Sequence, residues 1–286
     1  MANSGFYVDL VSNSSAKFFK DNTVSHFATK LHKPIEFNDQ WEVGISEIFY
    51  PCEAYNVRND VKVSIFTLSV NNPRETKFLS SHDMTSGRLE AGYYKKLQGL
   101  VIAINDALRV HWNKRTIHKN LTISSVPKFD VLPNGHVKLT YGMSSDQKTV
   151  FYPAFSLSGN DDIERVLGFR HQEISFIAKK VNPNTYILTS KFEADIKAGR
   201  NFIFIYCDII RDHLVGDTSS PLLRVVPLSK GKFDNVGHAD FNPIMYFDVK
   251  TNRIETIYIK LCDENGDQIS FVGGHVHITL HFKPKA

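Results

Sequence analysis

The first fifty residues constrain the fold of this chain more than any other stretch. Two segments, 22–31 and 41–50, alternate apolar with polar side chains, and a polar connection joins them before Pro51. Alternation with a period of two is typical of strands that bury one face. The stretch contains no phosphate-binding loop, metal-ligand cluster or nucleophile in a turn. It therefore predicts the beginning of an antiparallel sheet whose function depends on its shape.

Aromatic and β-branched residues recur along the chain in short runs between Asn, Asp, Gly and Pro, which is typical of many short strands. Two of these runs, VKVSIFTLSV and HVHITLHF, alternate clearly. We expect strands at 22–31, 41–50, 61–70, 202–210, 222–228, 244–249, 254–262 and 275–283. Eight strands with a long gap after the third suit a double-sheet jelly roll that carries an insertion.

The gap has a different pattern. Apolar residues at helical spacing predict one amphipathic helix over 93–111, with its stripe formed by Leu97, Leu100, Val101, Ile104 and Leu108. A hairpin is expected around Pro133-Asn134-Gly135, and a short helix over 161–167 between a capping Asn160 and Gly168.

The expected fold is mainly β, a single jelly-roll β-sandwich with a mixed α+β insertion subdomain. Residues 1–71 would form the N-terminal part of the jelly roll with an N-terminal arm. Residues 72–200 would form the insertion subdomain, and residues 201–286 the C-terminal part of the jelly roll.

Composition excludes several classes of function. Of the 286 residues 42% are hydrophobic and 22% charged, and the formal net charge is +4 without a long run of like charges. This pattern gives no reason to expect dedicated nucleic-acid binding. The N-terminus lacks a basic segment followed by an apolar one, so we expect no signal peptide. No window approaches the ~18 apolar residues of a membrane span. The three cysteines, Cys52, Cys207 and Cys262, are expected to be reduced thiols.

Histidines near the C-terminus are the strongest candidates for chemistry. His275, His277 and His281 would share one face of a strand, as metal-binding histidines do in cupin jelly rolls. The accompanying carboxylate and upstream histidines of a cupin are missing from the expected positions. We therefore expect a solvated or interface face, with no metal and no cofactor. At a subunit contact, such a row would make assembly sensitive to pH.

Two further groups suggest chemistry less strongly. Asp263–Asp267 resembles part of a calcium loop but lacks the glutamate at its twelfth position, so a hairpin turn is the better interpretation. A hydrolase set could be drawn from Asp208, Asp212 and His213 with Ser219 and Ser220, but no serine lies in a G-x-S-x-G turn. We expect no catalytic residues, and the protein is not expected to be an enzyme.

Core residues are predicted from the second segment, where Trp41, Val43 and Ile45 would share the buried face of a strand. The segment before the first expected strand holds the candidate interface residues, which would pack on a neighbouring subunit. The alternative is an extra strand that covers a sheet edge. The candidate arm residues are Phe6, Leu10, Phe18 and Phe19.

The N-terminal stretch resembles a recurring signature of the minor capsid (penton) proteins of Maverick/Polinton elements and adintoviruses, which are related to virophage pentons. The matching residues are Ser12, Asn13, Ser14, Ser15, Phe19, Asn22, Phe27, Leu31, Pro34, Ile35, Trp41, Glu42, Val43, Ile45, Glu47, Ile48, Tyr50 and Pro51. Shorter pieces agree at LEAGYY, at Ile104, Asn105, Ala107 and Leu108, at Val166–Phe169, and at Asp263, Gly266, Ile269, Phe271, Leu280, His281 and Phe282.

The resemblance implies a virion structural protein, a penton subunit that forms pentamers at icosahedral vertices. Its partners would be four further copies of itself and hexamers of the major capsid protein. The protein would be made in the host cytoplasm and reside in the virion, with the nucleus open as the place of assembly. The alternatives are a jelly-roll binding module that recognises a receptor or glycan, and, after it, a cupin-type metalloenzyme.

Overall fold

The computed structural model describes residues 5–70, 80–110, 116–118, 121–145, 150–158, 161–169, 176–177, 179–182, 185–197, 200–228 and 235–285. The chain divides into two compact units. The first comprises Met1–Tyr55 and Arg200–Ala286, and the second comprises Asn56–Gly199. Each unit has a hydrophobic core of its own.

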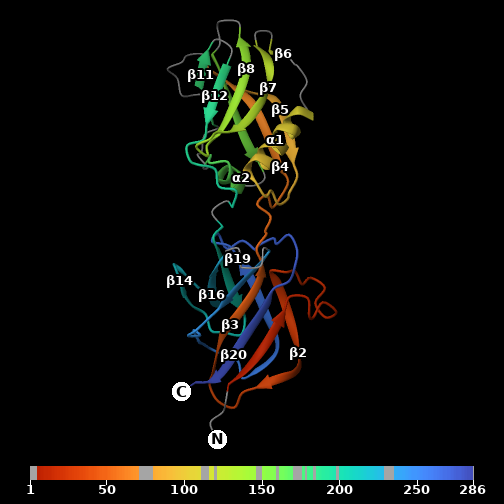
Figure 1. The fold of residues 1–286 in the computed structure, drawn as a ribbon, viewed down its shortest axis with the longest axis vertical. Helices are drawn as coiled ribbons and strands as arrows, with labels where there is room; N and C mark the ends of the chain where they lie inside the picture. The colour runs from red at the N-terminus through yellow and green to blue at the C-terminus, as the bar shows by residue number, and fades with distance from the viewer. Residues whose placement is uncertain are drawn as a thin grey trace. The chain divides into compact units, whose positions relative to one another are not determined.

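Two antiparallel sheets form the first unit (Figure 1). One sheet has the order β1-β20-β3-β17, with the two-residue β18 also paired to β3, and the other has the order β16-β13-β19-β2. The bounds of the first sheet are β1 Phe6–Val11, β20 His277–Pro284, β3 Trp41–Pro51, β17 Val236–Asp240 and β18 Phe247–Asp248. Those of the second are β16 Leu222–Pro227, β13 Phe202–Cys207, β19 Arg253–Cys262 and β2 His26–Glu36. A small hairpin, β14 His213–Val215 with β15 Thr218–Ser220, lies between β13 and β16 in the sequence.

The strand order is that of a jelly roll. When the main described strands of this unit are counted along the chain, the first sheet holds the first, eighth, third and sixth, and the second sheet holds the fifth, fourth, seventh and second. Every pairing is antiparallel, and consecutive strands lie in opposite sheets except the fourth and fifth, which pair with each other in the second sheet, as in a jelly roll of two Greek keys. The second unit is inserted between the third and fourth of these strands. The expected fold class is confirmed.

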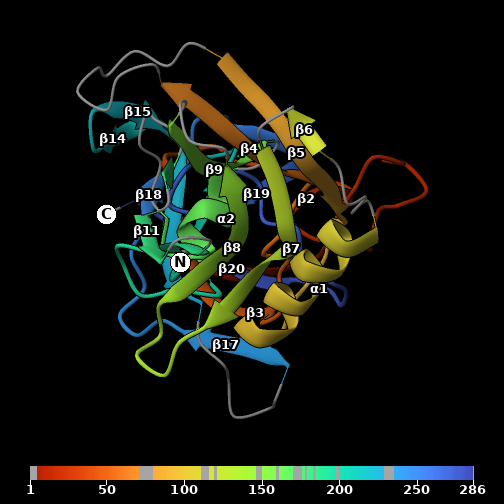
Figure 2. The same ribbon diagram turned by 90° about the horizontal axis from the view of Figure 1, so that it is seen from above.

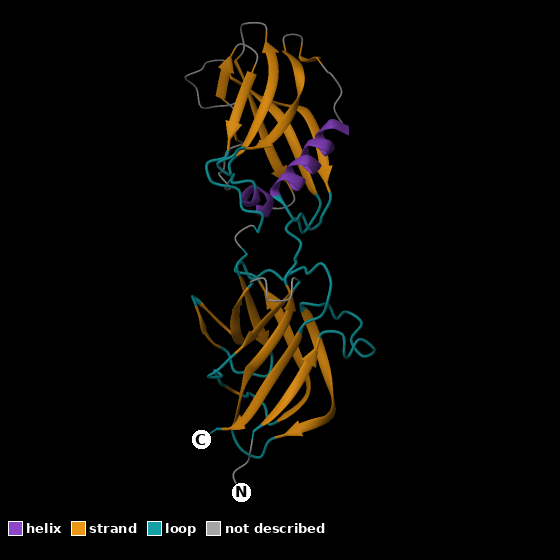
Figure 3. Ribbon diagram, in the orientation of Figure 1, coloured by secondary structure: helices purple, strands orange, loops and turns teal. Residues whose placement is uncertain are grey.

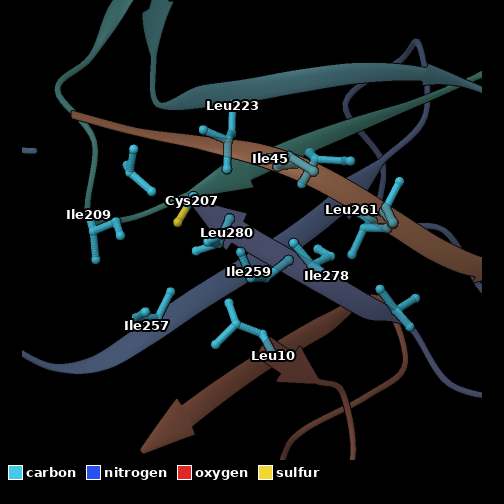
Figure 4. Close-up of a cluster of buried hydrophobic side chains, with 14 of the residues drawn as sticks. Leu10, Ile45, Cys207, Ile209, Leu223, Ile257, Ile259, Leu261, Ile278 and Leu280 are labelled. Atoms are coloured by element: carbon cyan, nitrogen blue, oxygen red, sulfur yellow. The ribbon is translucent and has the colours of Figure 1, made fainter. Parts of the chain in front are cut away.

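Aliphatic side chains from both sheets fill the interior of the jelly roll (Figure 4). Leu10, Ile45, Ile278 and Leu280 come from one sheet, while Ile205, Leu223, Ile257, Ile259 and Leu261 come from the other, and each is at most 2% exposed. The inner faces therefore pack on each other, which leaves the two outer faces to meet solvent or a partner.

The second unit is also built from two sheets, with the orders β10-β9-β4-β5 and β11-β12-β8-β7-β6. The first has the bounds β10 Phe176–Ile177, β9 Val150–Ser158, β4 Val61–Val70 and β5 Ser80–Leu89. The second has β11 Lys179–Asn182, β12 Thr185–Thr189, β8 Val137–Ser145, β7 Leu121–Val131 and β6 Thr116–His118. The sheets meet where the ring of Phe129 on β7 contacts that of Phe155 on β9 edge to face, at 5.6 Å.

Helix α1 (Leu97–Val110) packs against β5 and β7 of this unit (Figure 2). Its apolar stripe is Leu100, Val101, Ile104 and Leu108, all buried in the core of the second unit, as helical spacing predicts. The short helix α2 (Asp161–Val166) belongs to the same unit (Figure 3). It ends before Gly168, whose φ of +79° provides the left-handed residue of a helix C-terminus. Asn160, its expected N-cap, lies outside the described residues.

Several strand assignments differ from the sequence-based expectation. The segment 61–70 is β4, which pairs with β5 and β9 of the second unit, so the first domain boundary falls at 55/56 rather than 71/72. The second boundary falls at 199/200. The segment 244–249 contributes only β18, and the sixth jelly-roll strand is instead β17. The reason is that alternation identifies a strand without specifying its partner.

Candidate functional site: the two outer faces of the jelly roll

The outer face of the β1-β20-β3-β17 sheet holds histidine, aromatic and acidic side chains in ordered rows. Along β20 the inward residues Ile278, Leu280 and Phe282 are fully buried. Their neighbours His277 and His281 are half-buried and face outward. We call this surface the histidine-acid face, and define it by the outward residues Tyr7, Asp9, Glu47, Phe49, His238, Asp240, His277, Thr279 and His281.

One row of this face is a stack of three rings from three strands. His277 on β20 lies opposite Phe49 on β3, which lies opposite His238 on β17. The ring of His238 lies 4.4 Å from that of Phe49 at an interplanar angle of 15°, and the ring of His277 lies 6.0 Å away at 16°. The phenyl ring thus has an imidazole on each side, so a proton gained by either imidazole would face an aromatic ring.

The next row is acidic. Asp9 of β1, Thr279 of β20, Glu47 of β3 and Asp240 of β17 lie in register. Glu47 Oε1 lies 2.8 Å from His238 Nε2, and Asp9 Oδ1 lies 3.3 Å from His277 Nε2. The Thr279 hydroxyl donates a hydrogen bond of 2.7 Å to Asp9 Oδ1. Each end of the ring stack therefore has its own carboxylate.

His281 occupies a more enclosed position on the same face. Its Nδ1 lies 2.7 Å from the hydroxyl of Tyr246, and its ring lies 4.5 Å from that of Tyr7. The ammonium group of Lys283 lies 4.0 Å from the Tyr246 ring centroid. Burial, followed by the positive charge of Lys283, lowers the pKa of His281 below its ordinary value. Both effects favour the neutral form of this imidazole.

The three histidines do not all have the expected positions. His277 and His281 share the outward face of β20, whereas His275 precedes the strand and lies 3.3 Å from Asn13 Nδ2. Within the described residues, no group of three or more His, Cys, Asp and Glu side chains has the geometry to hold a metal ion. The arrangement presents imidazoles and carboxylates outward, away from the packed interior where a cupin holds its metal.

The outer face of the other sheet has a different chemistry. Phe202, Phe204 and Tyr206 alternate outward along β13, and Tyr258 and Lys260 do so along β19. Lys260 lies in register with His26 on β2 and Tyr206 on β13. We call this surface the basic-aromatic face, and define it by Phe18, Phe19, Lys30, Phe202, Phe204, Tyr206, Val225, Tyr258 and Lys260.

Two of the candidate arm residues lie on this basic-aromatic face. Phe18 is 65% exposed, and its ring lies 4.6 Å from the ammonium group of Lys30 on β2. Phe19 contacts Tyr258 of β19 edge to face, with ring centroids 6.0 Å apart. The segment that follows β1 is therefore folded over this sheet, where Phe18 remains available to a partner.

Phe6 and Leu10, the other two candidate arm residues, are part of β1. Leu10 is fully buried, and Phe6 stacks on Phe282 at a centroid distance of 5.1 Å. Both belong to the jelly-roll core because β1 pairs along its length with β20. The structure thus matches the alternative interpretation, a strand that covers a sheet edge, and these two side chains are not available as an arm.

The predicted core residues of β3 lie close together. Val43 and Ile45 are at most 2% exposed in the jelly-roll core. Trp41 is half-buried at the end of the strand, where its ring lies 5.1 Å from that of Phe37 and 5.5 Å from that of Phe6. A β-bulge after Ile45 shifts the register with β20 by one residue, so that Ile48 points inward where strict alternation predicts Glu47.

The remaining candidates have structural partners. The Asp263 carboxylate accepts hydrogen bonds from the backbone N–H groups of Asn265 and Asp267, which closes a turn around Gly266 at φ +81°. The Asp208 carboxylate accepts the backbone N–H of Tyr258 at 2.8 Å. The first contacts are those of a hairpin turn, and the second satisfies a backbone N–H group of β19 at the end of β13.

His213 and Ser220 face each other across the β14–β15 hairpin. The His213 ring stacks on Phe247 at 4.7 Å. No hydrogen bond between these two side chains, and none joining them to Asp208 or Asp212, appears among those of the described residues.

Most residues of the two faces were not predicted from the sequence. Asp9, Glu47 and Phe49 alternate with buried residues and could have been recognised from that pattern. His238 and Asp240 lie in an unpredicted strand. The run Phe202–Cys207 is apolar on both faces, so its composition conceals which side is outward.

The chain is similar to solved structures. It resembles the selenomethionine-labelled mavirus penton protein, with 11% sequence identity over 99% of this chain and 100% of that chain, at a TM-score of 0.47. No family model matches the sequence. No curated protein matches it. Over the described residues, no helix is long and apolar enough to cross a membrane.

Proposed function

We propose that this protein is a virion structural protein, the penton subunit that forms pentamers at the vertices of an icosahedral capsid and contacts hexamers of the major capsid protein. The observation that carries the proposal is the combination of a complete jelly-roll strand order with an interior filled by aliphatic side chains. A penton needs no ligand cavity between its sheets, because its function depends on contacts made by the outer surfaces.

The N-terminal signature supports this assignment because its residues build the jelly roll itself. Phe27 in β2, and Val43, Ile45 and Ile48 in β3, are core residues. The motif by which the chain resembles penton proteins is therefore the motif that forms the second and third strands. The role is structural and needs no cofactor, catalytic residue, dedicated nucleic-acid site or membrane span, and the protein would reside in the virion.

A fivefold ring requires a heterologous interface, in which one surface of each copy meets a different surface of the next. The jelly roll offers two outer faces with different chemistry, one rich in carboxylates and imidazoles and the other in lysines and aromatic rings. A receptor- or glycan-binding module would function as a monomer or a closed small oligomer without requiring such a difference.

Multi-angle light scattering of the purified protein tests the proposal. A mass five times the 32.5 kDa of one chain supports it. Co-expression with the major capsid protein of the same element, followed by electron microscopy, should place the protein at the vertices. A protein that remains monomeric at every salt and protein concentration, and is absent from particles, would show that the proposal is wrong.

A further inference from the structure

We propose that the histidine-acid face of one copy binds the basic-aromatic face of the next copy, and that protonation of the histidines weakens this contact. The inference rests on the proposed function, since it assigns the residues of the subunit interface and its response to pH. The partner of each face is a second copy of this chain.

The charges of the two faces are complementary. The histidine-acid face presents Asp9, Glu47 and Asp240 in one row across its sheet. The basic-aromatic face presents Lys30 and Lys260 outward from neighbouring strands, while the carboxylates of Glu36 and Glu255 on the same strands are paired with Arg253. Opposite charges across an interface guide association and set its register, whereas like charges oppose it. Two copies can therefore associate face to opposite face, and two identical faces repel each other.

Both faces also hold exposed apolar surface of the kind that interfaces bury. Tyr7 on the histidine-acid face is 63% exposed. On the other face Phe18 is 65% exposed, Phe202 and Tyr258 are each 44% exposed, and Val225 is 38% exposed. Aromatic residues are enriched at protein interfaces, and several together on one sheet are unusual for a monomer. The contact would combine a charged row with aromatic packing.

Titratable groups on the histidine-acid face give the contact its pH dependence. His277 faces Asp9 from β1 and Phe49 from β3, and His238 faces Glu47 and Phe49. Imidazoles ordinarily gain a proton between pH 8 and 5. Above this pH range the histidine-acid face carries a net negative charge and attracts the lysines of the next copy. Within the range, each proton bound by an imidazole offsets the negative charge of one carboxylate.

Other charged groups lie around these histidines, and none of those named here reverses the loss of negative charge on acidification. Asp240 extends the acidic row on β17, and at the enclosed end Lys283 is paired with Glu42 at 3.4 Å. His281, beside Lys283, Tyr7 and Tyr246, adds a further positive charge only at lower pH, because its pKa is lowered. On the partner's face His26 lies beside Lys260, so its protonation adds repulsion. Acidification therefore weakens the contact from both sides.

Charge reversal tests the pairing of opposite faces. The variant Asp9→Lys/Glu47→Lys should lose assembly, with the concentration for half-assembly raised about a hundredfold or more, and so should Lys30→Glu/Lys260→Glu. The fourfold variant, with both faces reversed, should recover pentamers because the faces are complementary again. Matched reversals on the second unit, Glu90→Lys/Glu193→Lys and Lys191→Glu/Lys197→Glu, should assemble like the unmodified chain.

A mixture of the two variants that each have one reversed face, Asp9→Lys/Glu47→Lys and Lys30→Glu/Lys260→Glu, provides a sharper result. Each variant can bind only the other, so copies must alternate, and a ring of five cannot alternate. The mixture should form even-numbered or open assemblies rather than pentamers. If instead the fourfold variant stays monomeric while its melting temperature is unchanged, the faces do not pair with each other and the inference is overturned.

The pH dependence is tested on the unmodified chain, whose assembly is compared at pH 7.5 and pH 5.5. Pentamers should dissociate at the lower pH, and His238→Gln/His277→Gln should reduce the difference. Equal assembly of both proteins at both pH values contradicts the pH dependence.

An unmodified chain that never assembles refutes the proposed function. Pentamers that tolerate every reversal refute only this inference, as does a reversal that blocks binding to the major capsid protein while pentamers persist.

Discussion

Arg200 Nε lies 3.7 Å from the Asp263 carboxylate, and both side chains are almost fully buried, at 7% and 0% exposed. The same guanidinium donates a hydrogen bond to the backbone carbonyl of Tyr55. Tyr55 is the last residue before the inserted unit and Arg200 is the first after it. The buried guanidinium of Arg200 therefore links the two chain ends that flank the inserted unit to the turn that follows β19.

Asp263→Asn should lower the free energy of unfolding by about 3–5 kcal/mol, since it leaves a buried guanidinium without its carboxylate while keeping an oxygen for the turn. Glu255→Gln is the matched control, because the Arg253–Glu255 pair is more than half exposed and contributes less than about 1 kcal/mol. Chemical denaturation measures both. Equal losses in the two variants would show that the buried pair is not a fastening contact.

The stability lost when a core side chain is truncated should depend on how deeply it is buried rather than on the size of its ring. Phe282→Ala should cost about 3–5 kcal/mol, since Phe282 is fully buried. Trp41→Ala should cost less, because Trp41 is half-buried at the strand end. Thermal melting compares the two variants. A larger loss for Trp41→Ala would mean that its ring is enclosed more fully than the structure indicates.

Removing β1 should unfold the jelly roll rather than merely weaken association. Deletion of residues 1–11 exposes the edge of β20 and removes the fully buried Leu10. In contrast, Leu214→Ser changes a side chain that is 85% exposed and belongs to neither outer face, so it should change the free energy of unfolding by less than about 0.5 kcal/mol. Circular dichroism and light scattering separate the outcomes. A folded truncated protein would revive the interpretation of this segment as an arm.

The three thiols should differ sharply in reactivity. Burial raises the pKa of Cys207 to about 12, and burial also raises that of Cys262. Since the thiolate is the reacting form, both should be inert towards a thiol reagent at pH 8 in the native protein, whereas the partly exposed Cys52 should react first. Quantification of the released chromophore, with Cys52→Ser as the control, measures this. Rapid modification of all three would contradict the burial.

Stability should fall on mild acidification through His281. Its folded pKa lies below the unfolded value, so the unfolded chain takes up the proton more readily. The stabilisation from its neutral form is present above a pH of about 6.5, the ordinary pKa of His, and is lost as the pH falls towards the folded pKa. His281→Gln should flatten the melting profile between pH 7.5 and 5.5, and the exposed His32→Gln should not. Identical slopes for both variants would refute the role of His281.

Local pattern determined much of the fold. Short runs of aromatic and β-branched residues, several of them alternating with period two, located β2, β3, β4, β13, β16, β19 and β20 within a few residues, and helical spacing identified the buried stripe of α1. Gly135 and Gly266 adopt positive φ where turns were expected, and Gly168 does so where a helix was expected to end. These features depend on neighbours along the chain, whose geometry is fixed by the backbone.

Only the tertiary structure decided which strands pair. Alternation in 61–70 could not reveal that β4 belongs to the second unit, and the apolar residues of β1 suggested an arm until its pairing with β20 placed Leu10 in the core. The His277–Phe49–His238 row joins residues far apart in sequence. The sequence states which side chains share a face of one strand. The register between strands, set by long-range burial, decides which faces combine into a surface.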